Sequence, residues 1–436
     1  MSLHRNYAPA LLAIFAFALI SRTTWAQTDR ATIEGTVTDP SGGVVSGAKI
    51  DITAVATGLT DERMTNQHGE YRFPGVAIGV YQVVLERSGF NTKQIDAVEV
   101  RVGETRTLDI RLEVGKREEK VEVRATAEPY ERSSAEASIV IGKNQIDNLP
   151  VNGRDWANLT LLAPFAQDDG GGDQRTIRFA GRARDDNNFS FDGVDAGGIQ
   201  EQAQKSQTRL QISEDAIAEY RVNSALYDAE YGTQAGGQIN VVTKSGSNEF
   251  HGTAFGYLRN STFDARNFND GPQVAPFRMG QYGMTFGGPI IKDKTFFFIN
   301  YEGLRQYQGQ TVTAAVPNDM FLNQALGQAP QLCPILQSFP WRQSTGTVGT
   351  CAPRFVFPDS SFDTPSGDAQ NFTHIAPTTV HEDTWLVRID LKFSDKTTLY
   401  GRAQRDISLV DGPAGNLFDK LRTINHPANY GPATRV

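Results

Sequence analysis

Residue types that carry out chemistry are few in this sequence, and they are not arranged as in common enzyme sites. The six histidines and two cysteines show neither the CxxC nor the HExxH spacing that binds zinc. His374 and His381 are the closest pair of histidines, and we interpret them as ordinary loop residues. A GxSxG motif is absent, and neither cysteine lies beside a base that could activate it. We therefore predict no catalytic residue, metal or cofactor, and no enzymatic activity.

Four aspartates close to residue 190 raise the alternative of a calcium site, because calcium prefers several carboxylate oxygens. They are Asp185, Asp186, Asp192 and Asp195. Their spacing does not match the loop of an EF-hand. Aspartate is also common in turns, where its side chain bonds the nearby backbone. We interpret these residues as turn residues and keep calcium as the less favoured alternative.

The two cysteines, Cys333 and Cys351, are the remaining candidates for covalent chemistry. Both lie in a stretch rich in proline, glycine and serine, which fits a loop in an oxidising compartment. We predict a disulfide between them that closes this loop. A loop of this size would gain roughly 3 kcal/mol of stability from the constraint on the unfolded chain.

The N-terminus has the features of an export signal. Arg5 precedes an apolar run at residues 8–20, and Thr24 and Ala26 supply the small residues of a cleavage site. The run is too short to span the ~30 Å core of a bilayer as a helix. A transmembrane anchor is therefore the less favoured alternative, and we predict a signal peptide at residues 1–26.

Charge and composition exclude one class of partner and favour a β-rich fold. Asp and Glu number 50 against 42 Lys and Arg, and the formal net charge of −8 argues against the basic surface that nucleic-acid binding needs. Glycine and aromatic residues are abundant, as in all-β proteins. We predict a mainly β protein that binds no nucleic acid. Its segments are residues 1–26, 27–115, 116–132, 133–246 and 247–436.

Residues 27–115 contain short alternating strands separated by Gly, Pro and Asn turns, which predicts a transthyretin-like or immunoglobulin-like β-sandwich. Ile50 and Ile52, for example, share one face of their strand. The segment resembles the carboxypeptidase regulatory-like family through the motifs GTVTD at 35–39, VSGA at 45–48, GEYRF at 69–73 and Tyr81. The resemblance implies no peptidase activity, because no zinc motif accompanies it. It leaves open carbohydrate binding or a role as a spacer.

Residues 133–246 mix short helices, turns and strands, which predicts an α+β domain. We predict a hairpin between residues 176–179 and 188–191, where apolar residues flank polar ones. We also predict a short helix from Ser213 to Ala218, because the Ser213 hydroxyl could accept hydrogen bonds from its first backbone N–H groups.

From residue 247 onward, apolar and polar residues alternate along longer segments. Tyr282, Met284 and Phe286 alternate with glycine and threonine, and long polar connections alternate with short turns. This pattern is typical of an outer-membrane barrel, with apolar side chains toward lipid and polar ones toward the lumen. A soluble sandwich with one wet face gives the same period and stays an alternative. We predict about five strands of an antiparallel transmembrane β-barrel, at ~10 residues each.

The last two segments resemble Oar-like TonB-dependent outer-membrane receptors, in which a plug domain precedes a barrel. The plug motifs are LPVNGRDWANL, FDGVDA, IAEYRVNSALYDAEYG and GGQINVVTKSG, and the barrel motifs are SNEFHGTAFGYLRNSTFDARNF and GGPIIKDKTFFFINYEGLR. The resemblance implies a plug at 133–246, the start of a barrel at 247–436, and a place in the lipid of the outer membrane. Because such barrels have roughly 22 strands, we expect an incomplete barrel and an N-terminal fragment.

The same resemblance implies energy-coupled uptake, with TonB as the periplasmic partner. A short segment after the charged linker resembles the TonB box that pairs with TonB, and it consists of Val121, Glu122, Val123, Arg124 and Ala125. The segment has no evident hairpin partner, so its free backbone groups could add to the edge of another sheet. The alternative is that it forms the last strand of the preceding sandwich.

The change of periodicity near residue 245 predicts the connection between plug and barrel. The candidate hinge residues are Lys244, Ser245, Gly246, Ser247, Asn248 and Glu249. The ligand stays open among siderophore, glycan and peptide, because we expect most of the extracellular loops that would select it to be missing from this fragment. The competing function is a surface binding or adhesion protein that uses the N-terminal sandwich and the long loops.

Overall fold

The structure is a computed structural model. The predicted signal peptide and the linker residues 116–120 lie outside the residues that it describes. These residues are 29–115, 121–124, 136–151, 154, 156–168, 177–183, 186–196, 212–227, 235–266, 274–317, 319–334, 361–362, 369–394 and 397–411.

The N-terminal segment is a β-sandwich, as predicted. Its strands are β1 (Ala31–Thr38), β2 (Lys49–Ala54), β3 (Thr60–Met64), β4 (Glu70–Val76), β5 (Gly79–Glu86), β6 (Lys93–Val100), β7 (Thr105–Thr107) and β8 (Ile110–Arg111). One sheet has the order β4-β1-β7 with β8 also on β1, and the other has the order β3-β2-β5-β6-β9. Alternate residues such as Ile50 and Val83 point between the sheets and are fully buried. The period-two pattern of the sequence therefore specifies this core.

Strand β9 (Val121–Arg124) lies at the edge of the second sandwich sheet. It pairs in parallel with β6, with Lys93 opposite Val121 and Asp96 opposite Arg124. The segment is therefore not unpaired, although its partner is a parallel strand and not a hairpin neighbour. The alternative, in which it is the last strand of the sandwich, describes its position. A parallel partner must come from a distant crossover, so a search for a neighbouring hairpin strand could not find it.

The middle domain, residues 136–243, contains a five-stranded sheet of order β10-β15-β16-β13-β14. Its elements are β10 (Ala137–Ile141), α2 (Lys143–Asn148), η2 (Trp156–Leu162), β11 (Ala166–Asp168), β12 (Ile177–Phe179), β13 (Asn188–Phe191), β14 (Val194–Asp195), η4 (Glu214–Ala216), β15 (Ile217–Ala225) and β16 (Gln238–Thr243). The predicted hairpin is wrong, because β12 pairs with β11, whereas β13 pairs in parallel with β16.

Aromatic residues fill the core of the middle domain. The buried Trp156 ring meets Phe191 and Tyr220 edge-on, with ring centroids 6.2 and 5.1 Å away. The Tyr220 hydroxyl donates to the Trp156 carbonyl oxygen at 2.9 Å, so the buried hydroxyl of Tyr220 has a hydrogen-bond partner. Edge-to-face packing of this kind adds to the stabilisation from burial alone.

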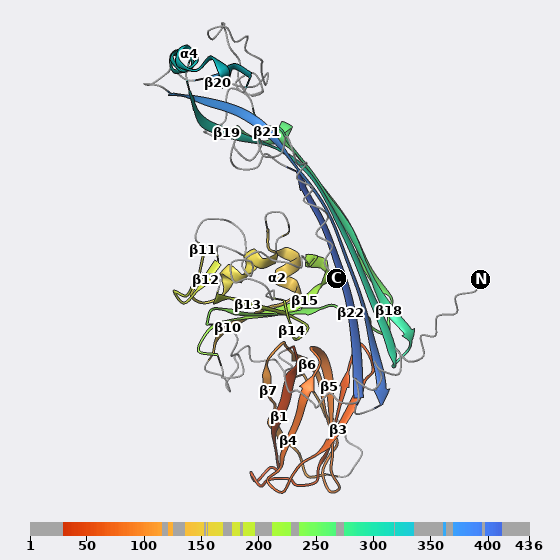
Figure 1. Cartoon of the computed structure of the whole chain (residues 1–436). Helices are drawn as coiled ribbons and strands as arrows, with labels where there is room; N and C mark the ends of the chain where they lie inside the picture. The colour runs from red at the N-terminus through yellow and green to blue at the C-terminus, as the bar shows by residue number, and fades with distance from the viewer. Residues whose placement is uncertain are drawn as a thin grey trace, which may run out of the picture.

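Most of the described residues from 251 onward form one long antiparallel sheet, which we call the long sheet. Its strands are β17 (His251–Asn260), β18 (Phe277–Ile291), β19 (Thr295–Pro317), β20 (Ser361–Phe362), β21 (Ala369–Ser394) and β22 (Thr397–Asp411). The order is β17-β18-β19-β21-β20, with β22 also on β21. Short helical elements lie at η5 (Ser261–Phe263), α4 (Asp319–Gln328) and η6 (Pro330–Leu332). Figure 1 shows the curved long sheet beside the middle domain, with the sandwich below both.

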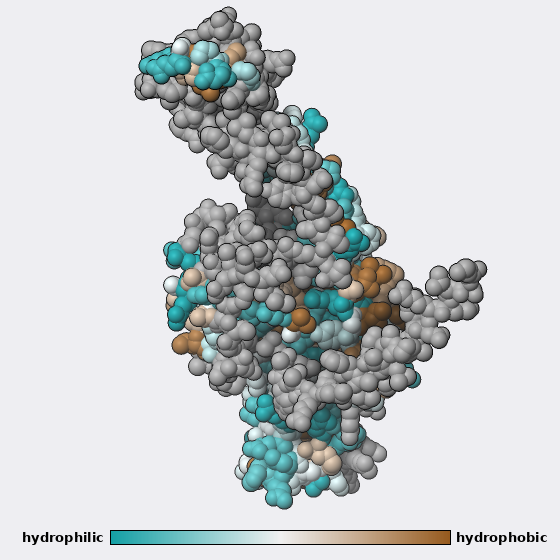
Figure 2. All heavy atoms as spheres, in the orientation of Figure 1, coloured by the Kyte–Doolittle hydropathy of each residue, from teal (hydrophilic) through white to brown (hydrophobic). Residues whose placement is uncertain are grey.

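The two faces of the long sheet differ as the alternation predicts. Tyr282, Met284 and Phe286 are exposed on one face, and Figure 2 shows hydrophobic residues gathered over this part of the sheet. Phe298 and Leu386 on the other face are buried and join the core of the middle domain. An apolar outer face and an inner face that contacts another domain fit a membrane barrel wall. Among the described residues, no helix has the length and apolar character needed to cross a membrane.

Candidate functional site: the face between the middle domain and the long sheet

Asp192 is the central polar residue between the middle domain and the long sheet. It follows β13 in a left-handed backbone conformation with φ of 48°, and its own N–H donates to the Val241 carbonyl at 2.9 Å. Its side chain accepts hydrogen bonds from the N–H and the hydroxyl of Thr243, both at 2.8 Å. The turn therefore aims a buried carboxylate out of the edge of the domain, toward the sheet.

Two arginines of the long sheet meet this carboxylate. Arg388 and Arg402 lie opposite each other on β21 and β22, and one guanidinium nitrogen of each lies 3.1 and 3.0 Å from Asp192. Two like charges directly opposite on neighbouring strands repel. Asp192 offsets that repulsion, and Asp390 also pairs with Arg388 at 2.9 Å. The four side chains form a neutral network only when the middle domain is in place.

Further contacts hold the same network in a fixed geometry. Arg388 Nη1 also donates to the Thr243 carbonyl at 3.1 Å, and its guanidinium lies 4.8 Å from the centre of the Tyr400 ring. The Tyr400 hydroxyl donates to the Asp192 carbonyl oxygen at 2.5 Å. Because the ions are removed from water, loss of one partner leaves an uncompensated buried charge and is costly.

A second polar contact lies around Glu302 of β19. Ser213 donates its hydroxyl hydrogen bond to Glu302, and the Gln281 side-chain amide donates to Glu302 Oε1 at 2.5 Å. Ser213 is the residue before η4, but its side chain makes no cap hydrogen bond to that turn. The predicted capping role is therefore wrong, because the hydroxyl serves the contact between domains instead.

Arg154 of the middle domain extends this second contact. Its guanidinium pairs with Asp215 at 2.8 Å and lies 4.2 and 5.4 Å from the ring centres of Phe255 and Tyr257. These two aromatic residues of β17 therefore face the middle domain. Burial raises the pKa of the neighbouring Glu214 to about 6, although Arg154 opposes this shift. The arginine thus combines ion pairing with cation–π contacts.

The candidate hinge, residues 244–249, is held by its neighbours at both ends. The Lys244 N–H donates to the Ala216 carbonyl at 2.8 Å. Asn248 accepts from the Asp293 N–H at 2.9 Å and donates from its own N–H to the Ala56 carbonyl of the sandwich at 2.9 Å. A Cβ at Gly246 would lie 2.4 Å from the Phe297 carbonyl oxygen. The segment is anchored in this structure, and its role as a hinge stays a prediction.

The other predicted residues are placed as follows. Cys333 is disulfide-bonded, whereas Cys351 lies outside the described residues, so the pairing of these two cysteines stays a prediction. His374 and His381 lie in β21 opposite Val312 and Arg305, so their interpretation as loop residues is wrong. Within the described residues, no cluster of His, Cys, Asp and Glu could hold a metal ion.

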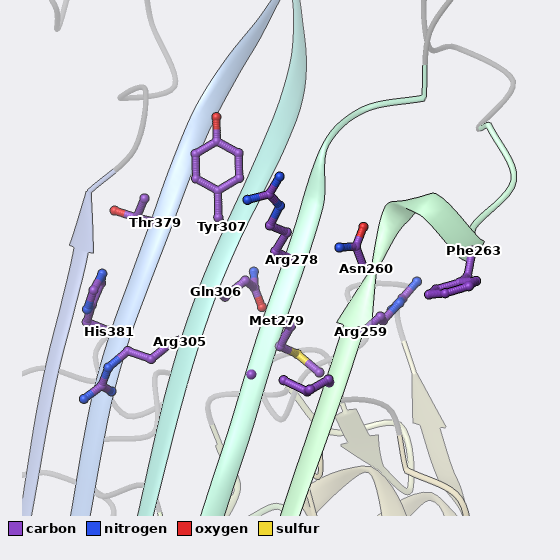
Figure 3. A pocket seen from close by; sticks show the side chains of 12 residues that line it. Arg259, Asn260, Phe263, Arg278, Met279, Arg305, Gln306, Tyr307, Thr379 and His381 are labelled. Carbon is purple, nitrogen blue, oxygen red and sulfur yellow. The ribbon is translucent and has the colours of Figure 1, made fainter.

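A cavity of about 640 Å³ lies near the far ends of β17, β18, β19 and β21 (Figure 3). Arg259, Arg278 and Arg305 are among its lining residues. Arg305 is held by both carboxylate oxygens of Asp383 at 2.8 Å, and Arg259 pairs with Asp264 at 3.3 Å. Two of these three arginines are thus engaged by acidic residues of the chain itself, and we assign no ligand to the cavity.

Sequence reasoning missed the arginines at the centre of the interface. Arg388 alternates with the apolar Val387 and Ile389, which marks it as inward-facing, and Arg402 lies opposite it on β22. That signal was present in the sequence. Their partner Asp192 is 196 residues from Arg388 along the chain, and no spacing rule connects such distant residues.

Comparison with known proteins agrees with this architecture. Residues 242–429 match a family model described as an outer membrane beta barrel domain, and residues 32–113 match one described as a carboxypeptidase regulatory-like domain. The chain therefore carries both domains, and it is an outer-membrane protein. It is also a homologue of the TonB-dependent transporter Oar of Myxococcus xanthus, with 26% identity over 318 residues. This match covers 69% of the chain and 29% of that transporter, so the chain spans less than a third of its relative.

Solved structures with some likeness include outer-membrane receptors. A ferric enterobactin receptor from Pseudomonas aeruginosa, in complex with enterobactin, has a TM-score of 0.37 and 16% identity, over 64% of this chain and 34% of that one. The outer membrane transporter YddB from Escherichia coli has a TM-score of 0.39 and 13% identity, over 63% of this chain and 33% of that one.

Proposed function

We propose that this chain forms part of a TonB-dependent receptor for energy-coupled uptake of an extracellular ligand, with the middle domain as its plug. The observation that carries the proposal is the Asp192 network, which attaches the middle domain to the wall through Arg388 and Arg402. When the whole domain is displaced, its charged groups and those of the long sheet return to water together, so no charge is left buried without a partner. A polar attachment therefore holds a plug in place and still allows TonB to dislodge it.

Strand β9 is the segment of the chain that TonB engages in this proposal. It lies at the end of its sheet, paired with β6. Within the described residues its other edge has no strand partner, so an extended segment of TonB can add there by β-augmentation. The resemblance of Val121, Glu122, Val123, Arg124 and Ala125 to a TonB box supports this role, as does the homology to a TonB-dependent transporter.

The ligand class stays open among siderophore, glycan and peptide. The proposed function is therefore tested by measuring binding of its partner, with the purified periplasmic domain of TonB as the probe. The full chain in detergent micelles is immobilised, and binding is measured by interferometry for the wild type, Val123→Pro and Val123→Thr. Proline removes a backbone donor and fixes φ, whereas threonine keeps the β-branched shape and the backbone N–H.

We expect Val123→Pro to weaken TonB binding by at least about tenfold, equivalent to ~1.4 kcal/mol, and Val123→Thr to bind as the wild type does. If the proline variant binds TonB as tightly as the wild type does, β9 is not the segment that TonB binds. It would favour the competing function of a surface binding or adhesion protein, which does not depend on this strand.

A further inference from the structure

The turn between β6 and β7 is where the sandwich touches the middle domain. The Val102 N–H donates to Glu219 Oε1 at 2.5 Å, and the Gly103 carbonyl accepts from Arg221 Nη1 at 3.1 Å. Gly103 has a φ of +65°, and a Cβ there would lie 3.2 Å from the Arg221 side chain. Both partners project from β15, so the turn fits closely against one strand of the middle domain.

Arg221 joins this turn to the point where the chain enters the middle domain. It is 1% exposed, and its Nη2 donates to Glu136 Oε2 and to the Ser138 hydroxyl, both at 3.0 Å. Its Nε donates to the Asn223 side chain at 2.8 Å. A planar guanidinium can hold partners in several directions at once, whereas a lysine ammonium on a flexible stem cannot fix them in the same way.

Two routes lead from β9 to this arginine. Along the chain, β9 is followed after residues 125–135 by Glu136 and then β10, which pairs with β15. Through the sandwich, β9 pairs with β6, and β6 ends at Val100, next to the turn that holds Gly103. One route reaches Arg221 at Glu136 and the other at Gly103.

We infer that Arg221 is a positioning residue that couples β9 to the middle domain through the sandwich as well as along the chain. The function of the sandwich is then to transmit a displacement of its edge strand to β15. This inference rests on the proposed role of β9 as the TonB-binding segment. It gives the carboxypeptidase regulatory-like domain a mechanical function in the receptor.

The test measures amide hydrogen exchange in the full chain in detergent micelles, without TonB. Val123→Pro perturbs the pairing of β9 and β6 and stands in for displacement of the strand. It is introduced alone and together with Arg221→Met, which keeps the length of the side chain and removes its donors. Arg63→Met is the matched control, because Arg63 pairs with Asp61 at 2.9 Å within the sandwich itself.

We expect Val123→Pro alone to raise exchange in residues 101–104 and 217–225, the latter by about tenfold, within the range of coupling between contacting residues. In the Arg221→Met background, we expect residues 101–104 to respond still and residues 217–225 to respond at least about threefold less than in the wild type. Some response remains because the Val102–Glu219 hydrogen bond and the pairing of β10 with β15 do not involve the Arg221 side chain. The Arg63→Met background should leave the response of the wild type unchanged.

An equal response of residues 217–225 in the wild-type and Arg221→Met backgrounds would overturn the inference, as would no response in either. If Arg221→Met also exposes the amides of β13 and β16, the domain has lost its fold. In that case, Arg221→Lys and Gly103→Ala replace Arg221→Met in the same exchange experiment. The first changes the contact from the middle domain, and the second changes it from the sandwich. Because TonB is absent here, a failure of TonB to bind β9 would refute the proposed function and leave this result to stand separately.

Discussion

The substitution Asp192→Asn tests the network between the middle domain and the long sheet. The variant keeps an oxygen for the Thr243 N–H but places an amide where Arg402 now meets a carboxylate at 3.0 Å. Breaking a buried ion pair by removing one partner costs about 3–5 kcal/mol. Asp390 still pairs with Arg388, so the lower end of that range, ~3 kcal/mol, is the expected loss.

The assay is pulse proteolysis of the full chain in detergent micelles across a urea gradient. It measures the free energy of detachment or unfolding of the middle domain. With a slope of about 1–3 kcal/mol per molar urea, a loss of ~3 kcal/mol moves the midpoint by roughly 1–3 M. Asp51→Asn is the control, because Asp51 forms an ion pair with Lys49 at 3.0 Å near the surface of the sandwich, and such pairs contribute little stability. Its change should stay within about 0.5 kcal/mol.

A double-mutant cycle separates the network from a general loss of packing. Asp192→Leu and Arg402→Leu should each destabilise the attachment, and the double variant should lose less than the sum, because it leaves no buried charge unpaired at this position. Additive losses, or a loss under about 0.5 kcal/mol for Asp192→Asn, would refute the role assigned to the network.

Two further outcomes follow from the contacts around the middle domain. Burial raises the pKa of Glu219 to about 7 in the structure, so docking of the sandwich should weaken as pH rises from ~4.5 to ~7. Energy transfer between labels on the two domains should show this loss, and Glu219→Gln should abolish its pH dependence. Gly246→Ala should destabilise the chain by about 1–3 kcal/mol, because the added Cβ meets the Phe297 carbonyl oxygen at 2.4 Å. Gly142→Ala, with nothing within 4 Å, is its control in the same urea assay.

The sequence predicts the elements of this fold better than their partners. Strands such as Lys49–Ala54 and Phe277–Ile291 follow from alternation alone, because the period of two is a property of a single strand. The partner of β9 and the parallel pairing of β13 with β16 depend on residues far away in the chain. The predicted hairpin failed for that reason, since it assumed that neighbouring segments pair with each other.

The candidate site shows the same division. Asp192 was recognised as a turn residue, and its positive φ agrees with a turn. Its pairing with two arginines could not be predicted, because it depends on how the long sheet curves around the middle domain. The burial of Arg221 could not be predicted for a related reason. An arginine in a strand is expected at the surface unless its charge is paired, and its partners are far away in the chain.

The middle domain is held by buried charge on two sides and by apolar packing within. Asp192 follows β13 and faces the wall, whereas Arg221 lies on β15 and faces the sandwich. Between them, Trp156, Phe191 and Tyr220 form an aromatic core. Phe298 and Leu386 of the long sheet also pack against this core, so displacement of the domain exposes part of it, while the contacts among the three rings stay within the domain. In the proposed receptor, displacement of the plug therefore breaks the two polar contacts and this apolar contact before its own sheet unfolds.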